Sequence, residues 1–293
     1  MLDLFYFGGI KMTHQPFESN SRIWQSPHVA AAWRRQSAMR EEIMGPTTQH
    51  MLEAAGIKPG SRVLDIAAGT GEQSLAAARI VGTSGFVLAT DISEPMLNVV
   101  AESAKQEGLT NMSTQVMDAE NIYLEPGSFD AVICQHGLMF IARLDLALSG
   151  IYKTLRKGGR FAAVVWSNPE QNLAFSVPMS ILLRAVGRSS SLLESTGIFS
   201  LGRPEKLISL FQTAGFHDIK VLPIPRIYRA LDAKTFLQER IAMASGGTAD
   251  LLNQLPEVQL NAALDEILES LRAFEGTNGF AAPCESLLVY GNK

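Results

Sequence analysis

The chain is poor in cysteine, and its two cysteines lie far apart in the sequence. Cys134 and Cys284 form no Cys-x-x-Cys pair, and no cluster of His, Cys and carboxylate residues has the spacing of metal ligands. We therefore expect a reduced, cytoplasmic protein with no metal site.

Charge and long apolar runs are also scarce. Only 18% of the 293 residues are charged, with 25 basic and 29 acidic side chains and a net charge of −4. The absence of a basic block argues against nucleic acid as a partner. No apolar run reaches the length of a membrane span, and the first ten residues lack the features of a secretory signal. Because 46% of the residues are apolar, we expect an ordered chain with a substantial core.

The most informative stretch is Val63–Gln73, which reads Val-Leu-Asp-Ile-Ala-Ala-Gly-Thr-Gly-Glu-Gln. An apolar strand ends near Asp65, a turn of small residues with Gly69 and Gly71 follows, and a helix then begins. This arrangement predicts a nucleotide-like ligand at the helix N-terminus. The third glycine of the dinucleotide fingerprint is missing, and the acid would repel a pyrophosphate, so a cationic ligand fits better.

Apolar strands alternate with helices through the first half of the chain. The pattern predicts an α/β fold whose mainly parallel sheet has helices on both faces. The predicted strands are 62–66, 86–90, 114–116, 129–134 and 161–166, with two late strands at 219–222 and 286–290. The predicted helices between them are 73–80, 95–107 and 145–155.

Asp-x-Ala-x-Gly-x-Gly after an apolar strand resembles motif I of the class I S-adenosylmethionine (SAM) methyltransferases. The turn Leu155–Phe161 is similar to the Leu-Lys-Pro-Gly-Gly turn of the same family, with Lys157 in place of the proline. Residues 61–166 most resemble the small-molecule branch that includes the ubiquinone and menaquinone C-methyltransferases. The resemblance implies a Rossmann-like sheet of seven strands, with the last strand antiparallel and inserted between its neighbours. Ala67 departs from the glycine of many members, and alanine is tolerated there if its φ is negative.

The organisation that we predict is a mobile tail over 1–20 and one methyltransferase domain over 21–293. Its core comprises 45–170, 204–228 and 279–293. Helical additions occupy 21–44, 171–203 and 229–278, and they would form a lid over a substrate or a dimer interface. The oligomeric state stays open between monomer and homodimer.

The resemblance also implies which residues bind SAM. Asp65, Ala67, Gly69 and Gly71 would hold the methionine half, with Asp65 near the ammonium group. Asp91 stands where an acid can accept both ribose hydroxyls. The remaining predicted contacts are Ile92 and Met96 on the adenine face, Asp118 and Ala119 at its edge, and Cys134 and Gln135 beside the ammonium group. Ile92 and Met96 also fit as plain core residues.

His136 is the candidate catalytic base because it follows a strand at the edge where ligands bind. The alternative is a structural histidine. No Asn-Pro-Pro-Tyr motif follows the same strand, which argues against nucleic acid or protein amides as substrates. The apolar run Phe175–Leu183 hints at a small hydrophobic or aromatic substrate, although core packing is the stronger explanation of such a run.

Three other functions remain open at this stage. They are transfer of an aminopropyl or carboxypropyl group, a non-catalytic SAM-binding regulatory module, and an NAD(P)-dependent oxidoreductase. Asp65 and the missing third glycine disfavour the last.

Overall fold

The computed structural model describes residues 4–7, 10–13, 24–195, 197–242 and 247–293. The strands are β1 (Leu4–Phe7), β2 (Ile10–Thr13), β3 (Arg62–Ile66), β4 (Phe86–Asp91), β5 (Met112–Val116), β6 (Phe129–Gln135), β7 (Leu155–Trp166), β8 (His217–Ala230), β9 (Glu275–Gly276) and β10 (Gly279–Asn292). The α-helices are α2 (Pro27–Arg35), α3 (Ser37–Ala54), α4 (Glu72–Val81), α5 (Glu94–Gln106), α6 (Leu144–Thr154), α7 (Leu173–Ala185), α8 (Leu192–Ser195), α9 (Pro204–Thr213), α10 (Ala233–Ala242), α11 (Gly247–Gln254) and α12 (Glu257–Leu271). Short 3-10 helices lie at Leu138–Phe140, Pro169–Gln171, Gly197–Phe199 and Arg272–Phe274.

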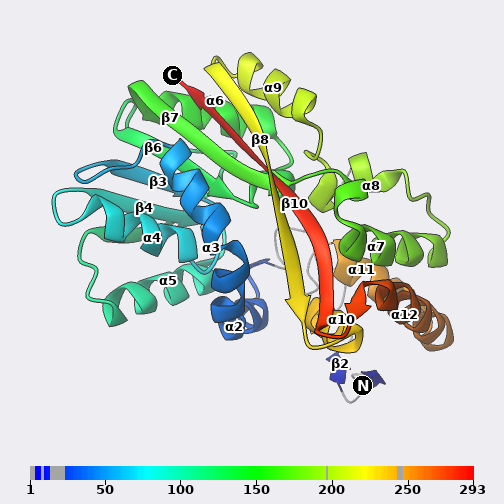
Figure 1. Ribbon diagram of the computed structural model, residues 1–293. Helices are drawn as coiled ribbons and strands as arrows, with labels where there is room; N and C mark the ends of the chain where they lie inside the picture. Colours follow the sequence, from blue (N-terminus) through cyan, green and yellow to red (C-terminus); the bar gives the residue numbers. More distant parts are fainter. Residues whose placement is uncertain (1–3, 8–9, 14–23, 196, 243–246) are drawn as a thin grey trace.

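The central sheet has the strand order β5-β4-β3-β6-β7-β10-β8 (Figure 1). β3 to β7 run parallel to one another, and β10 is antiparallel to both β7 and β8, between which it lies. The predicted α/β class, the mainly parallel sheet and the inserted antiparallel strand are therefore confirmed. The strand count is slightly higher than predicted, because the short β9 pairs with β10.

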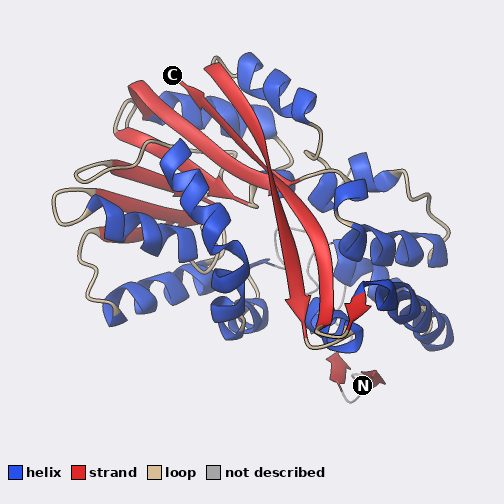
Figure 2. Cartoon of the chain, viewed as in Figure 1, coloured by secondary structure: helices blue, strands red, loops and turns tan. Residues whose placement is uncertain are grey.

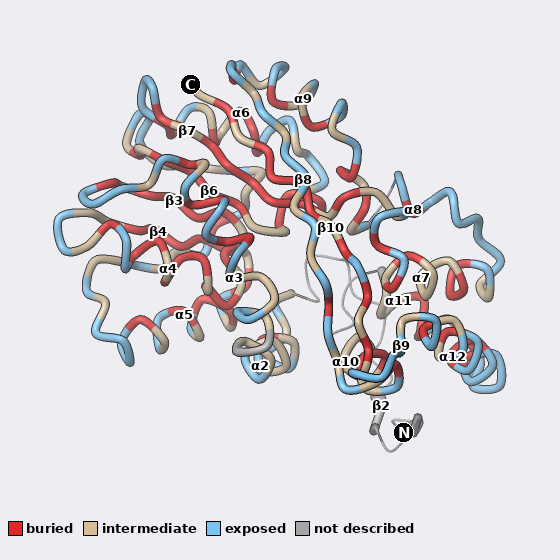
Figure 3. The backbone as a smooth tube through the Cα atoms, in the orientation of Figure 1, coloured by how far each residue is buried: buried red, intermediate tan, exposed pale blue. Residues whose placement is uncertain are grey.

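Helices cover both faces of this sheet (Figure 2). Residues of α6 and α9 pack on one face, where Phe161 of β7 stacks on Phe211 of α9 with ring centroids 5.1 Å apart. Residues of α3 and α4 pack on the other, where Met51 and Ala77 belong to the same apolar cluster as Val63. β3, β4 and β6 lie between these two layers and are almost wholly buried (Figure 3). Burial on both faces explains why they read as continuous apolar runs.

The two late strands are much longer than predicted. β8 and β10 pair from His217–Asn292 to Ala230–Phe280, whereas β10 leaves β7 after the Ser286–Trp166 pair. The outer parts of the two strands therefore extend beyond the rest of the sheet. The expected helix from residue 229 was wrong at its start, because β8 continues to Ala230. Pro223 and Pro225 look like strand ends in the sequence, but β8 is an edge strand, and edge strands tolerate proline.

Beyond the sheet, the helices of the two predicted additions form a second apolar cluster with the outer parts of β8 and β10. We call α7, α8, α10, α11, α12 and these strand extensions the lid. Phe236 of α10 stacks on Phe280 of β10 with centroids 4.5 Å apart, and α7 packs near α12 through residues such as Leu182 and Leu264. The lid therefore has a core of its own beside the sheet.

The predicted tail over residues 1–20 lies mostly outside the described residues. Within it, β1 and β2 pair as a short antiparallel hairpin for which the sequence predicts no regular structure. None of the described helices has the length and apolar character needed to cross a membrane.

Candidate functional site

A cavity of about 1270 Å³ lies between the carboxyl ends of the parallel strands and the lid. Its first half is lined by the turns that follow β3, β4, β5 and β6, and by α2 and α3. Its second half is lined by α7, α10, α11 and α12. Ligands of open α/β sheets bind at this edge, so the cavity is the candidate site.

The turn after β3 brings backbone to the cavity wall. Ala67 and Gly69 both line the cavity, with φ of +54° and +57°. The condition of a negative φ, under which alanine is tolerated without strain, is therefore not met at Ala67. Its left-handed backbone costs about 1–2 kcal/mol in a non-glycine residue. A Cβ on Gly137 would lie 2.6 Å from the Ala67 methyl, so the alanine fits here beside a glycine.

Asp65 lies underneath this turn and does not line the cavity. Its side chain is fully buried, one carboxyl oxygen accepts a hydrogen bond from the Ser74 hydroxyl, and the other has no partner among the described residues. Burial raises the pKa of Asp65 to about 7, and the Ser74 hydrogen bond opposes that rise. Gly71 is also buried behind the wall, where its φ of +83° starts α4.

Asp91 ends β4 and reaches the cavity wall. One carboxyl oxygen accepts from the Gly69 N–H at 2.9 Å and the other from the Ser93 N–H at 2.8 Å. Burial raises the pKa of Asp91, and these two hydrogen bonds counteract the rise. Asp91 therefore links the turn after β3 to the turn after β4, and each of its carboxyl oxygens keeps a further lone pair that can accept a hydrogen bond from a ligand.

Four other predicted residues line the same half of the cavity. They are Ile92, Met96, Asp118 and Ala119. Met96 is 2% exposed, whereas Asp118 is exposed, and its carboxylate accepts from the Glu120 N–H at 2.9 Å. The structure thus brings acids from the ends of two strands to one cavity.

The end of β6 supplies the last predicted group. Gln135 and His136 line the cavity, and the buried Cys134 does not. The Gln135 amide oxygen accepts from the Thr48 hydroxyl of α3 at 2.9 Å. Burial raises the pKa of the Cys134 thiol, which keeps it protonated.

His136 is a buried imidazole without a fixed partner. Both ring nitrogens are shielded from solvent and make no hydrogen bond to a described residue, and the ring lies 4.8 Å from that of Trp166. Burial, and then the nearby Arg226 charge, hold the pKa of His136 well below its ordinary value. The ring is therefore neutral at pH 7 and presents one donor and one acceptor.

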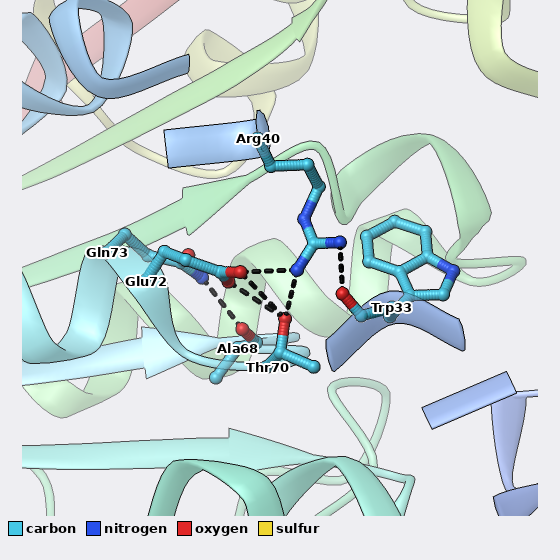
Figure 4. Close-up of polar contacts among 6 residues, drawn as sticks. All are labelled: Trp33, Arg40, Ala68, Thr70, Glu72 and Gln73. Atoms are coloured by element: carbon cyan, nitrogen blue, oxygen red, sulfur yellow. Dashed lines mark hydrogen bonds and ion pairs between the residues drawn. The ribbon is translucent and has the colours of Figure 1, made fainter. Parts of the chain in front are cut away.

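Arg40 of α3 was missed by the sequence reasoning. Its guanidinium donates to the Thr70 hydroxyl at 2.7 Å and to the Glu72 carboxylate, and it also donates to the Trp33 carbonyl (Figure 4). The same group lies 4.8 Å from the centre of the Trp33 ring. Arg40 thus links the N-terminal helices α2 and α3 to the turn after β3. No local sequence pattern indicates this contact.

The lid half of the cavity is mainly aromatic and aliphatic. The lining side chains include Phe175, Met179 and Leu182 from α7, and Phe236 and Leu237 from α10. The predicted apolar stretch at 175–183 thus contributes both to the cavity wall and to the lid core. Among the described residues, no group of three His, Cys, Asp or Glu side chains has an arrangement that could hold a metal ion.

Comparison with known proteins agrees with this fold. A family model described as a methyltransferase domain matches residues 57–178. The ubiquinone/menaquinone biosynthesis C-methyltransferase UbiE of Teredinibacter turnerae is 30% identical over 170 residues, which cover 55% of this chain and 68% of that protein. The protein of the same name from Hydrogenovibrio crunogenus is 36% identical over 126 residues, which cover 43% of this chain and 50% of that protein.

A solved structure shares the fold across nearly the whole chain. Phosphoethanolamine N-methyltransferase 2 of Haemonchus contortus, in complex with S-adenosyl-L-methionine, has a TM-score of 0.58 at 19% identity. The match covers 97% of this chain and 62% of that one. The chain belongs to the SAM-dependent methyltransferases, and SAM is its cofactor.

The relatives resemble this chain only in part. The alignments span about half to two thirds of the curated relatives' length, and the family model ends at residue 178, within α7. Most of the lid therefore lies outside the region that the family model matches.

Proposed function

We propose that this protein transfers the methyl group of SAM to a small hydrophobic or aromatic metabolite enclosed by the lid. The observation that carries the proposal is that one continuous cavity spans both halves of the site. It joins the acid-lined turns after β3 to β5 with a chamber walled by aromatic and aliphatic side chains. A site of this shape holds a polar cofactor and an apolar acceptor side by side.

The cofactor-binding residues fit the chemistry of SAM. Gly69 has open space where a Cβ would be, so a ligand can approach its backbone. We infer that Asp91 accepts the ribose hydroxyls, that Ile92 and Met96 pack against the adenine, and that Asp118 and Ala119 contact its edge. Asp65 and Cys134 lie behind the cavity wall. Asp65 would act through the electrostatic field of its carboxylate, and Cys134 through its backbone at the end of β6.

The methyl group of SAM is already activated by its sulfonium, so the protein contributes mainly proximity and orientation. Holding two reactants in line contributes about 7–11 kcal/mol in favourable intramolecular cases. Closure of the cavity by α2, α3 and the lid serves this purpose, because it limits the positions that an acceptor can take.

We propose that His136 accepts a hydrogen bond from the acceptor group of the substrate. A neutral ring with two shielded and unpartnered nitrogens is suited to this role. The lowered pKa makes the imidazolium costly, so full proton transfer would need a substrate that acidifies as it reacts. His136→Gln would keep a polar group of similar size, and we expect it to lower kcat more than it raises KM.

Titration calorimetry with S-adenosylhomocysteine, NAD and NADP tests the cofactor site. We expect only S-adenosylhomocysteine to bind, and Asp91→Ala to weaken it at least tenfold, which corresponds to about 1.4 kcal/mol. Asp145→Asn is the matched control, since it neutralises an exposed acid on α6. Binding of NAD without S-adenosylhomocysteine would overturn the proposal.

A further inference from the structure

Arg226 lies at the place where the lid leaves the sheet. It is a β8 residue opposite Cys284 of β10, and its guanidinium donates at 2.5 Å to the hydroxyl of Ser286, the β10 residue at which the pairing with β7 ends. The same group contacts the Met44 sulfur of α3 and lies 5.4 Å from the centre of the Trp166 ring. Arg226 therefore contacts α3, β7 and β10 at once.

This cation is costly to keep in its surroundings. Burial lowers the pKa of Arg226, and its Nε atom is shielded from solvent without a hydrogen-bond partner among the described residues. No carboxylate in the described part of the chain forms an ion pair with the guanidinium. A link between Met44 and Ser286 would need no charge, since a neutral side chain would pack there at a lower cost. The charge itself therefore needs an explanation beyond packing.

The His136 ring packs against the same Trp166. The two ring centres lie 4.8 Å apart, with an angle of 36° between the ring planes. The backbone of His136 is left-handed, with φ of +53°, and its N–H donates to the Val164 carbonyl at 2.8 Å. Such a backbone is unfavourable for a non-glycine residue, and strain of this kind gathers at functional sites. His136 and Trp166 line the cavity, and Arg226 lies behind them.

Among the described residues, Arg226 is the charged group whose field reaches this ring. Burial and then the Arg226 charge hold the pKa of His136 well below its ordinary value. The other charged side chains around this part of the cavity do not contribute to that shift; they include Arg40, Glu41, Asp65, Glu72, Asp91 and Arg240. The ring is therefore neutral, and only a neutral ring has a nitrogen that can accept a hydrogen bond.

We propose that Arg226 is a positioning residue for methyl transfer. It holds Trp166 in place, and with it the His136 ring, and its charge keeps the ring in the neutral form that accepts a hydrogen bond from the substrate. The inference rests on the proposed function, because it depends on the role proposed there for His136. A protonated ring would have no acceptor and would add a positive charge to a cavity that binds a cationic cofactor. Arginine suits the task because its planar group packs on aromatic rings and stays charged.

Carbon-13 NMR of the whole protein, labelled at the Cε1 atoms of histidine and saturated with S-adenosylhomocysteine, tests the proposal. The His136 signal is identified by its absence from His136→Gln. In the parent protein we expect this signal to keep the chemical shift of a neutral ring from pH 8 down to pH 5. In Arg226→Met, whose side chain has a similar length and no charge, the signal should move at least halfway to the protonated position by pH 5.

Three further variants separate the charge from the packing. Arg226→Lys keeps the charge without the planar group, so His136 should stay neutral while the ring-current shift from Trp166 decreases. Arg226→Gln is a second neutral variant that can still donate to Ser286, and it should allow protonation as Arg226→Met does; it replaces that variant if the methionine prevents folding. Arg229→Met removes an exposed cation from the same strand and should leave the His136 signal unchanged.

Three results would overturn the proposal. The first is a His136 signal that stays neutral down to pH 5 in both neutral variants. The second is protonation to the same extent in Arg226→Lys, which would make Arg226 a packing residue alone. The third is a ring that already titrates in the parent protein. Calorimetry measures S-adenosylhomocysteine affinity in each variant: no binding by the parent protein would refute the proposed function, whereas intact binding with an unchanged His136 signal would refute only the role of Arg226.

Discussion

Asp65 should link cofactor binding to pH. Its carboxyl lies buried beneath the first turn, with one oxygen bonded to Ser74 and the other unpartnered among the described residues. Because burial raises its pKa from 3.8 to about 7, about half of the ligand-free molecules hold the proton at neutral pH. A cationic ammonium group beside this residue would favour the carboxylate and release that proton.

The size of the effect follows from the pKa. With a pKa of about 7, the deprotonated fraction is about one tenth at pH 6 and about nine tenths at pH 8. If only the carboxylate form binds well, the affinity for S-adenosylhomocysteine should be about tenfold weaker at pH 6 than at pH 8, or about 1.4 kcal/mol. The neighbouring His136 should not contribute, since its lowered pKa keeps it neutral over this range.

Calorimetry at pH 6, 7 and 8, in buffers of different ionisation enthalpy, measures both the affinity and the protons released. We expect release of about half a proton at pH 7, and a flat affinity profile in Asp65→Asn. A flat profile in the parent protein, with no proton release, would refute the placement of Asp65 near the ammonium group. So would a slope that persists unchanged in Asp65→Asn.

The titration of Asp65 also changes the free energy of unfolding, and the raised pKa fixes the direction of the change. The native pKa lies above the unfolded value, so between about pH 4 and pH 7 the native state holds a proton that the unfolded chain has lost. Stability should therefore decrease as the pH rises through this window, by up to about 4 kcal/mol from this one group. Urea unfolding of the ligand-free protein at pH 5 and pH 8 should show about 3 kcal/mol of this decrease, and Asp65→Asn should not show it.

Three further predictions follow from the local geometry. Gly71→Ala should lower the free energy of unfolding by about 2 kcal/mol or more, because the backbone there is left-handed and the new Cβ would lie 2.6 Å from a valine methyl of α5. Gly69→Ala is the control, since its Cβ would meet open space, and it should cost about 1 kcal/mol. Equal losses of the two variants in urea unfolding would contradict this. Arg40→Met should cost about 1–2 kcal/mol and increase proteolysis of α2 and α3, since the ion pair with Glu72 is largely shielded from solvent. Cys134 should react with a thiol reagent only after unfolding, because it is fully buried and its pKa is raised; fast reaction of the folded protein would refute this burial.

Local patterns predicted most of the sheet correctly. The strand over 62–66 agrees with the prediction at both ends, and the predicted helices 73–80, 95–107 and 145–155 lie within one residue of α4, α5 and α6 at each end. These segments combine buried apolar runs with helix-start and turn signals close in sequence, so short-range information suffices. β8 was predicted too short, because its alternating exposure and its two prolines acquire meaning only from its place at the sheet edge.

In the site, too, local patterns predicted some features and tertiary contacts decided the others. Nine of the twelve residues proposed from the sequence line the cavity, because the carboxyl ends of parallel strands meet at one edge. Three of them do not line it, because the sequence pattern does not distinguish a residue in the cavity wall from one buried directly beneath it. These are Asp65, Gly71 and Cys134. Arg40 was missed because it lies on a helix far in sequence from the turn that it contacts, and Arg240 because no local pattern places it in the cavity wall.

The sequence by itself determined the fold class, the glycine-containing turn, the strand-end acids and hence the family, because each depends on residues that are neighbours along the chain. Only the tertiary structure decided the left-handed backbone at Ala67, the buried and unpartnered imidazole of His136, and the depth of Asp65. It also placed the cation of Arg240 in the apolar half of the cavity. Burial and the field of distant charges arise when separate segments pack together, and no short stretch of sequence contains them.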